Sequence, residues 1–579
     1  MTIVMKKTSM SLLFARGARL LLFGLIAGPV IAGTFGIMVP AFGWFPPLGG
    51  ETFSLAPINA VLNAPGIWQS AWLSLSTALL ATALSYFCVM MFLAVMWEHG
   101  RVGWLVRALA PLLSVPHITI AVGLLFLLQP SGWLARLISP ALSGWERPPI
   151  FGIVPDDYGM VLVFGLMIKE IPFLLLMALS ALSQLPAHQW IATSRSLGHG
   201  PISSWCLIVQ PNLAPRLLLP VSIVLIFCIS VVDMAIILAP TTPPPLSLRV
   251  LNWFQDPDLT ARFTASAAAL FQVLLAGIAV CLWTILRWLC GIIQRTSVRS
   301  GIRFHWLSKS SRPLCFLGVV LIALPCAIGA LGLGVSLVWS VAEVWRFPDI
   351  LPSRWGLLAW SAGSVSLWDA AINTVLIGVS SAGLALVMVI VWCELTPEAG
   401  SEGQRKTISE MPFYIPLLIP QIAFLFGLQI MLVWLSLDGV YVTLIWAHLL
   451  FVFPYVLLSL GPAWRRWDNR LDDVGAALGA SRIERLIRIK LPVLIMPIMT
   501  SLAVGFAVSA ALYLPTIFVG GGRIVTLTTE AVTLASGAGR QNLGAATALQ
   551  MALPLIIFLC ADTVSRRRLF RRGSARSHR

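Results

Sequence analysis

Residues 473–492 read Asp-Val-Gly-Ala-Ala-Leu-Gly-Ala-Ser-Arg-Ile-Glu-Arg-Leu-Ile-Arg-Ile-Lys-Leu-Pro, a polar stretch between two long apolar ones. Residues 192–211 share its spacing, because in both stretches a glycine is followed by Ile after ten residues and by Pro after thirteen. A polar loop that recurs once in each half of an apolar chain predicts two equivalent halves. The matching residues are Gly198, Ile208 and Pro211 in the first stretch and Gly479, Ile489 and Pro492 in the second.

The composition predicts an all-α integral membrane protein. Of the 579 residues, 58% are hydrophobic and 11% are charged, whereas a soluble domain carries about 25% charged residues. Such a chain must be solvated by lipid, where only helices or closed barrels satisfy the backbone. The apolar runs are continuous rather than alternating, which indicates helices.

Twelve apolar runs are about 20 residues or longer, which is enough to cross the ~30 Å hydrocarbon core of a bilayer. We therefore predict about 12 transmembrane helices in two sets of six. The first set covers residues 18–40, 69–96, 108–130, 159–182, 217–239 and 265–292. The second set covers residues 313–340, 367–394, 411–436, 440–461, 493–519 and 545–563.

The two sets resemble each other beyond the polar loops. Trp68 and Trp368 both open the second span of their half, and Pro172 and Pro454 both interrupt the fourth span. Two halves that run in the same direction imply a pseudo-two-fold axis along the membrane normal. The predicted parts are a first half (1–293), a basic linker (294–312), a second half (313–565) and a basic tail (566–579).

The net charge of +16 does not indicate a nucleic-acid partner, because the basic residues lie between apolar runs and do not form one folded face. Such a distribution follows the positive-inside rule. The N-terminus, the linker and the tail are basic and are separated by even numbers of spans. We therefore expect both termini and both polar loops to lie on the cytoplasmic side.

The second polar loop has the composition of a docking element. Gly475, Ala476, Ala477 and Gly479 are small and allow a short helix to lie close to another surface. The alternative is an amphipathic helix that only rests on the lipid surface. Because the same spacing recurs in the other half, docking is the favoured interpretation.

The pattern E-A-A-x-x-x-G, followed by nine residues and I-x-L-P, is the signature of type I ABC importer permeases, and the second loop resembles it. Gly479, Ile489, Leu491 and Pro492 match, while Asp473 stands in place of the glutamate.

The first loop is a weaker match to the same signature. It keeps the glycine, the isoleucine and the proline, but Ala192 replaces the acid and Gln210 replaces the leucine. Across both halves the chain resembles the fused two-half permeases of the ferric-iron and thiamine importer group.

The resemblance implies two six-helix type I ABC permease repeats in a bacterial inner membrane. It also implies that each loop inserts as a coupling helix into a separate ABC ATPase subunit, two copies in all, which would bind ATP and Mg²⁺. A periplasmic binding protein would deliver a small solute, with a thiamine-like compound or ferric iron favoured. The expected coupling residues are Asp473, Ala476, Ala477, Gly479, Ile489, Leu491, Pro492, Ala192, Gly198, Ile208 and Pro211.

The sequence predicts neither an enzyme nor a resident cofactor. No G-x-x-x-x-G-K-[ST] occurs, so we expect ATP hydrolysis to reside in the partner subunits. No cluster of His, Cys and carboxylate residues has the spacing of metal ligands. We therefore expect no catalytic residues and no metal site in this chain.

Three ionisable residues in the fourth spans are candidates for the solute path, namely Lys169, Glu170 and His448. Ionisable groups within a membrane are costly and are commonly functional. The alternative is that they pair internally and only hold helices together.

Two other functional classes remain open. A secondary transporter can also have twelve spans in two halves, but it would need an ion or proton relay in place of docking loops. A membrane enzyme would place clustered acids at one membrane face. The identity of the solute does not follow from this chain.

Overall fold

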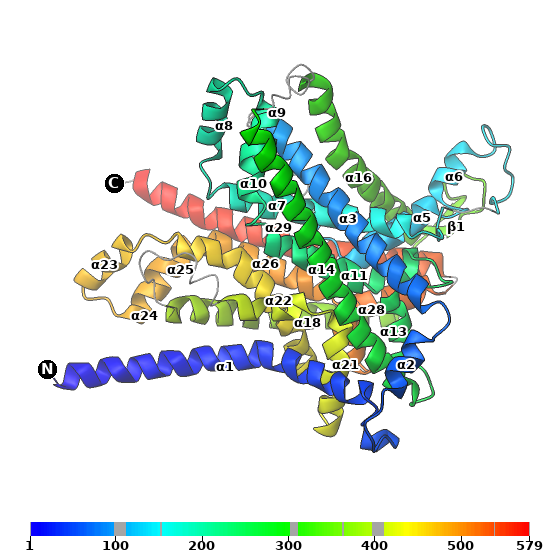
Figure 1. The fold of residues 1–579 in the computed structure, drawn as a ribbon, viewed down its shortest axis with the longest axis horizontal. Coiled ribbons are helices and arrows are strands. Elements are labelled where there is room, and N and C mark those ends of the chain that lie inside the picture. The colour runs from blue at the N-terminus through cyan, green and yellow to red at the C-terminus, as the bar shows by residue number, and fades with distance from the viewer. Residues whose placement is uncertain are drawn as a thin grey trace.

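The computed structural model describes residues 2–97, 112–150, 153–301, 311–361, 364–396, 410–537 and 539–577. The described chain is a bundle of helices with one small two-stranded sheet (Figure 1). This arrangement confirms the predicted all-α fold. Part of the predicted linker, residues 302–310, and the last two residues of the predicted tail lie outside the described residues.

The elements of the first part of the chain follow in order. They are α1 (Thr2–Ala41), η1 (Pro46–Leu48), α2 (Ala56–Leu62), α3 (Ile67–Met96), α5 (His117–Leu128), α6 (Trp133–Ile138), α7 (Met160–Leu182), α8 (Ala187–Ser196), α9 (Pro201–Ser204), the π-helix η2 (Trp205–Val209), α10 (Gln210–Leu213), α11 (Leu218–Ser230), α12 (Asp233–Leu238), α13 (Leu246–Phe254) and α14 (Ala261–Arg299).

The second part begins with α16, so that helices extend into the predicted linker from both sides. Its elements are α16 (Ser311–Ser340), β1 (Ala342–Val344), β2 (Arg354–Trp355), α17 (Leu358–Ser361), α18 (Ser364–Leu395), η3 (Met411–Tyr414), α20 (Ile415–Leu418), α21 (Gln421–Trp434), α22 (Tyr441–Arg465), α23 (Arg470–Ala477), α24 (Arg482–Arg485), the π-helix η4 (Leu486–Lys490), α25 (Leu491–Val493), α26 (Ile495–Ala511), α27 (Leu514–Gly520), α28 (Leu527–Ala535) and α29 (Arg540–Ser577).

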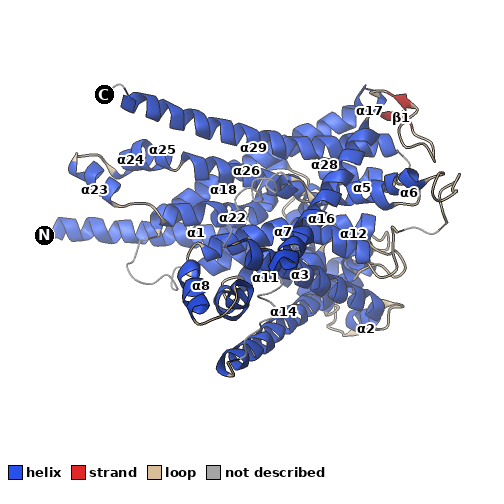
Figure 2. Ribbon diagram, turned by 90° about the horizontal axis from the view of Figure 1, so that it is seen from above, coloured by secondary structure: helices blue, strands red, loops and turns tan. Residues whose placement is uncertain are grey.

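Nine of the described helices are long and apolar enough to cross a membrane, and three bent helix pairs raise the number to as many as twelve. Two of these pairs join a polar loop to the span that follows it, with bends of 81° and 78°. The long helices form two sets of different inclination, with α3, α14 and α16 in one and α1, α18 and α29 in the other (Figure 1), and α14 also runs obliquely to α1 and α29 in Figure 2. The count agrees with the prediction of about 12 spans.

The predicted fifth span of each half, 217–239 and 493–519, is not one continuous helix. It is interrupted between α11 and α12 and again between α26 and α27. Hydroxyl groups bind the carbonyls that the breaks leave free: Ser247 Oγ donates to Val231 O at 2.8 Å and Thr528 Oγ1 donates to Ala510 O at 2.6 Å. A break inside a bundle is tolerated where such donors satisfy the backbone.

The helices α13 and α28 follow these breaks and are held in the same way. The N–H of Leu246 donates to Ser74 Oγ at 2.8 Å, and the N–H of Leu527 donates to Thr374 Oγ1 at 2.9 Å. Both leucines are fully buried. The two halves therefore repeat this contact residue for residue, although α13 and α28 lie in segments predicted to be loops.

The first helix of each half packs against the opposite half. Helix α1 lies along α21, and α16 lies along α5 and α3. Glycines allow the close approach, because a Cβ added to Gly36 would lie 2.9 Å from Gly427 Cα and one added to Gly332 would lie 2.8 Å from the carbonyl carbon of Gly123. This exchange joins the two halves.

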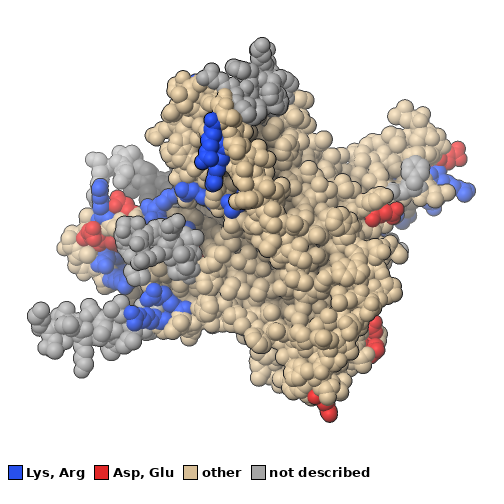
Figure 3. Space-filling model, in the orientation of Figure 1, with Lys and Arg blue, Asp and Glu red and all other residues tan. Residues whose placement is uncertain are grey.

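Charged side chains are sparse over the middle of the visible face (Figure 3). Lys and Arg gather at the end of the molecule where α23, α24 and α25 lie, near the beginning of α1. An uncharged band bounded by charged ends is the surface expected of a protein that spans a bilayer.

Candidate coupling loops and central cavity

The two polar loops have the same backbone conformation. In each, a helix ends at a glycine with positive φ, 87° at Gly198 and 82° at Gly479. The N–H of His199 donates to Ser194 O at 3.2 Å, and the N–H of Ala480 donates to Gly475 O at 3.0 Å. This is the Schellman arrangement, which places glycine at the left-handed position because it has no Cβ.

A π-helix follows the glycine in both loops. The residues of η2 and η4 occupy equivalent positions, and they contain Ile208 and Ile489 respectively. In the second loop a Cβ added to Gly475 would lie 2.9 Å from Ile489 Cδ1. The isoleucine therefore holds the preceding helix against the π-helix, and the space for it exists because residue 475 is glycine. Pro211 and Pro492 lie in the short helices α10 and α25 that come next.

Apolar side chains at the tips of both loops face solvent. Leu197 is 63% exposed and its counterpart Leu478 is 82% exposed, each directly before the left-handed glycine. Ala192, Asp473, Ala476 and Ala477 are also exposed. Exposed apolar side chains on a well-formed element are typical of an interaction surface.

The second loop is fixed to the bundle by charge. Lys490 Nζ donates to Glu394 Oε1 at 2.6 Å, and the Arg482 guanidinium donates to the Glu394 backbone carbonyl at 2.7 Å. The Lys490 ammonium also lies 4.5 Å from the ring centroid of Trp464. A cation over an indole face is stabilised by the ring quadrupole.

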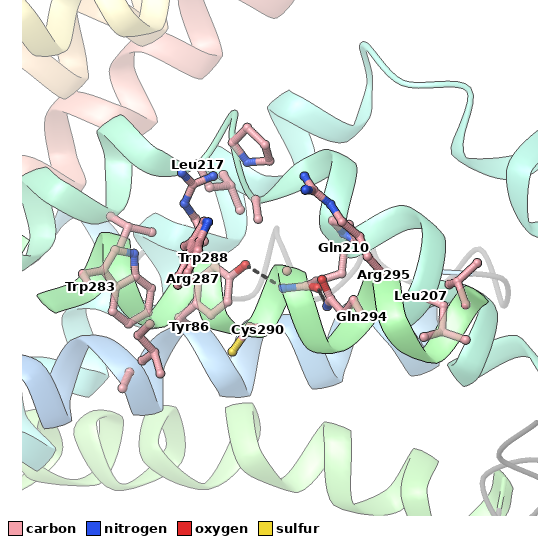
Figure 4. Close-up of a pocket in the computed structure, with 18 of the residues that line it drawn as sticks. Tyr86, Leu207, Gln210, Leu217, Trp283, Arg287, Trp288, Cys290, Gln294 and Arg295 are labelled. Carbon is pink, nitrogen blue, oxygen red and sulfur yellow. Dashed lines mark hydrogen bonds between the residues drawn. The ribbon is translucent and has the colours of Figure 1, made fainter. Parts of the chain in front are cut away.

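The first loop is fixed by side-chain amides instead (Figure 4). Gln210 Nε2 donates to the Tyr86 hydroxyl at 3.4 Å, and Gln294 Nε2 donates to Gln210 Oε1. Gln294 Nε2 also donates to the Cys206 carbonyl at 3.2 Å. Gln210, which departs from the leucine of the signature, thus connects the loop to α3 and α14.

A cavity of about 110 Å³ lies between the two halves where the fifth spans are broken. Polar groups on its wall include His117, Asp233 and Gln421, and the rings of Phe227, Phe451, Tyr455 and Tyr513 line it as well. Both breaks contribute residues, Val231–Asp233 from one half and Leu512–Leu514 from the other. A central cavity built from both halves is the candidate solute path.

The predicted path residues stand in different relations to this cavity. Lys169 Nζ donates to the carbonyls of Leu112 and Leu113 at 3.2 and 3.0 Å, where a helical turn ends before Pro116. Carbonyls at a helix end have no partner within the helix, so Lys169 stabilises that end. Glu170 Oε1 lies 3.8 Å from His117 Nε2. His117 lines the cavity, whereas Glu170 lies behind it and is not part of the lining.

His448 joins three helices. Its Nδ1 lies 2.8 Å from Ser509 Oγ and its Nε2 lies 3.1 Å from Thr516 Oγ1, so both ring nitrogens are hydrogen-bonded. It is not among the residues that line the cavity. Asp233 is also an ionisable residue within a predicted span, late in the fifth, but it is not among the sequence-based candidates for the path. The sequence shows the charge but does not show that a helix break places it at a cavity.

The described residues offer no group of three or more His, Cys, Asp or Glu that could hold a metal ion. The two regions provide a pair of exposed loops with one backbone conformation and a small polar and aromatic cavity. The arrangement suits the binding and passage of a solute.

No protein-family model matches the chain. Its relatives include the inner membrane ABC transporter permease protein YnjC of Escherichia coli (strain K12), which is 30% identical over 516 residues, 89% of this chain and 91% of the relative. The putative 2-aminoethylphosphonate transport system permease protein PhnV of Salmonella typhimurium is 26% identical over 255 residues, 43% of this chain and 94% of the relative. PhnV is thus about as long as one half of this chain.

Proposed function

Because this chain belongs to the family of ABC transporter permeases, we propose that it is the membrane subunit of an ATP-driven importer, which takes a small solute from a periplasmic binding protein. The observation that carries the proposal is the pair of loops with one backbone shape, each with an exposed leucine before a left-handed glycine. A secondary transporter has no use for two such docking surfaces.

Each loop inserts into one of two ABC ATPase subunits, which bind ATP and Mg²⁺. The exposed Leu197 and Leu478 enter the apolar part of the ATPase groove, and Asp473 meets its polar rim. Ile208 and Ile489 keep the loops in shape, together with the glycines and prolines that follow the signature.

The loops and both termini lie in the cytoplasm. This placement is supported by the Lys and Arg side chains around α23–α25 (Figure 3), because basic residues are retained on the cytoplasmic side.

Each loop is connected to the cavity by the span that directly follows it in the sequence, so a movement of the loop is transmitted to the cavity wall. The first loop continues through α10 into α11, and α11 ends at the break Val231–Asp233 on the cavity wall. The second loop continues in the same way through α26 to Leu512–Leu514. When two ATPases close and draw the loops together, the two walls of the cavity move relative to each other.

The solute is an organic cation of the thiamine type. Asp233 offers a negative charge, and aromatic rings such as Phe227, Tyr455 and Tyr513 surround the same space; aromatic faces attract cations. Ferric iron is the second candidate, and for it the described wall offers one carboxylate and one imidazole, Asp233 and His117.

Association with the ATPase tests the proposal. The full chain is purified with its ABC ATPase subunit, and complex formation is measured with and without ATP for Leu478→Gln, Leu197→Gln and the double variant. We expect binding to fall in each single variant and to be lost in the double variant, with the stability of the permease unchanged.

Two results would contradict it. One is a complex that forms equally well with the double variant. The other is solute uptake in cells that persists without the ATPase gene and stops when the proton gradient is collapsed, which would indicate a secondary transporter.

A further inference from the structure

A cavity of about 590 Å³ lies beside the first coupling loop. Its walls come from α3, α10 and the last turns of α14, and they include Tyr86, Gln210 and Gln294 (Figure 4). The cavity shares no lining residue with the cavity of the proposed solute path. A ligand bound in this cavity would therefore be distinct from the solute in the central cavity.

The charge on this cavity is positive. Arg287, Arg295 and Arg299 line it, and at intervals of eight and twelve residues they lie on one side of α14. Among the described residues of the lining none is acidic. Among the described residues, the buried Nε atom of Arg287 has no hydrogen-bond partner.

The position along α14 places the cavity at the membrane interface. Between Arg262 and Arg287 this helix has 24 residues without a charged side chain, which span about 36 Å at about 1.5 Å per residue. Arg287 is thus the first charge beyond the hydrocarbon core. Trp283 and Trp288 lie next to it and line the cavity, as expected of aromatic residues at an interface.

The rim of the cavity is apolar and open to lipid. Leu286 and Trp288 line it and are 50% and 62% exposed. An occupant must therefore combine a negatively charged head with an apolar body.

We propose that this cavity binds the headgroup of an anionic phospholipid. The phosphate lies between the guanidinium groups of Arg287 and Arg295, and the acyl chains lie along Leu286 and Trp288. Basic pockets between spans on the cytoplasmic side are suited to such headgroups.

The site exists in one half of the protein. The cavity beside the second loop has about 180 Å³ and is lined by two acidic residues, Glu394 and Asp472, as well as by three basic ones, so most of its positive charge is offset. The lipid would contact Gln210 and hence the first coupling loop, to which this residue belongs. Bound lipid would stabilise the position of that loop.

Native mass spectrometry of the purified full-length chain tests the proposal. Dioleoyl phosphatidylglycerol and dioleoyl phosphatidylcholine have the same chains and differ in the charge of the head. We expect tighter binding of phosphatidylglycerol, since each arginine near an anionic headgroup is worth roughly a fivefold change in affinity. Arg287→Gln should reduce this affinity by about that factor.

A second variant narrows the space and keeps the charge. A Cβ added to Gly291, on the cavity wall, meets nothing within 4 Å, so Gly291→Leu should project into the cavity and weaken the preference. Gly277 on the same helix is equally unobstructed and lies outside the cavity, which makes Gly277→Leu the matched control. Arg354→Gln, at a partly exposed ion pair with Glu343, controls for the loss of one charge.

Three results would overturn the proposal. The first is equal binding of the two lipids, and the second is unchanged binding to both Arg287→Gln and Gly291→Leu. The third is displacement of phosphatidylglycerol by inorganic phosphate in millimolar excess, which would make the ligand a free anion.

Discussion

Lys490 donates a hydrogen bond to Glu394 at 2.6 Å, and this ion pair fastens the second coupling loop to the end of α18. The Lys490 side chain is 9% exposed, so its charge has little access to water. In the first half residues 94 and 209 stand at these places as Ala and Val. The two loops therefore have one shape but different attachments.

Glu394→Gln should weaken the attachment of the second loop by about 1.5–3 kcal/mol, the usual contribution of a hydrogen bond to a charged group. We expect a lower midpoint of thermal unfolding and slower ATP-driven uptake. A double-mutant cycle with Lys490→Gln separates the pair from the single effects. If the two substitutions are simply additive, the ion pair does not hold the loop.

Gln210→Leu should loosen the first loop, although it restores the leucine of the signature. The substitution removes the bonds to Tyr86 and Gln294, each worth about 0.5–1.5 kcal/mol. We expect more ATP hydrolysed per solute transported, measured with the complete transporter in proteoliposomes. Asn212→Leu is the control, because Asn212 is exposed on the same short helix and bonds only to the Ile208 carbonyl. Equal coupling ratios in the two variants would contradict the role of the network.

Asp473→Ala should reduce transport far more than Ala192→Glu increases it. Asp473 is exposed at the beginning of the second loop, where it can meet an ATPase, whereas the first loop has alanine, Ala192, at the equivalent place. The measurement is ATP-dependent uptake together with the affinity of the ATPase. If both substitutions have equal and negligible effects, the proposed functional difference between the two loops is wrong.

Gly36→Ala should destabilise the contact between α1 and α21. The added Cβ would lie 2.9 Å from Gly427 Cα, and forcing atoms into a packed interface costs about 1–3 kcal/mol. Gly28, two turns earlier in α1, has nothing within 4 Å, so Gly28→Ala should be neutral or slightly stabilising through helix propensity. Thermal unfolding of the purified chain compares the two. A midpoint that falls equally in both variants would mean that the close contact is unimportant.

Much of this architecture can be predicted from the sequence because lipid imposes strong rules. Spans must be long and apolar, and a left-handed turn requires glycine, so the apolar runs and the turns at Gly198 and Gly479 are recognisable in the order of the residues. The contacts that attach the loops to the bundle cannot be recognised in this way, because residues such as Lys490 and Glu394 are 96 positions apart in the sequence.

The central cavity shows where such reasoning ends. Val231 and Leu512 adopt extended backbone conformations within apolar runs, and a hydropathy pattern does not distinguish a break from a helix. Ionisable residues in the middle of spans are the conspicuous candidates in a sequence, yet His448 is satisfied by hydroxyls from Ser509 and Thr516. Asp233, the carboxylate that lines the cavity, lies directly after a helix break. The position of this break cannot be predicted from the sequence.

Asp233→Asn should raise the concentration of a cationic solute needed for half-maximal uptake by about tenfold, if the carboxylate contributes about 1.4 kcal/mol to binding. The substitution keeps the shape of the side chain and removes its charge. Thiamine is the probe, uptake is measured with the complete transporter in proteoliposomes, and basal ATP hydrolysis should not change. Asp233→Glu keeps the charge and should retain most of the affinity.

Ser230→Ala is the control on the same wall of the cavity, because the Ser230 hydroxyl donates to the Ile226 carbonyl of its own helix. An unchanged affinity in Asp233→Asn, or an equal loss in Ser230→Ala, would show that the charge of Asp233 does not select the solute.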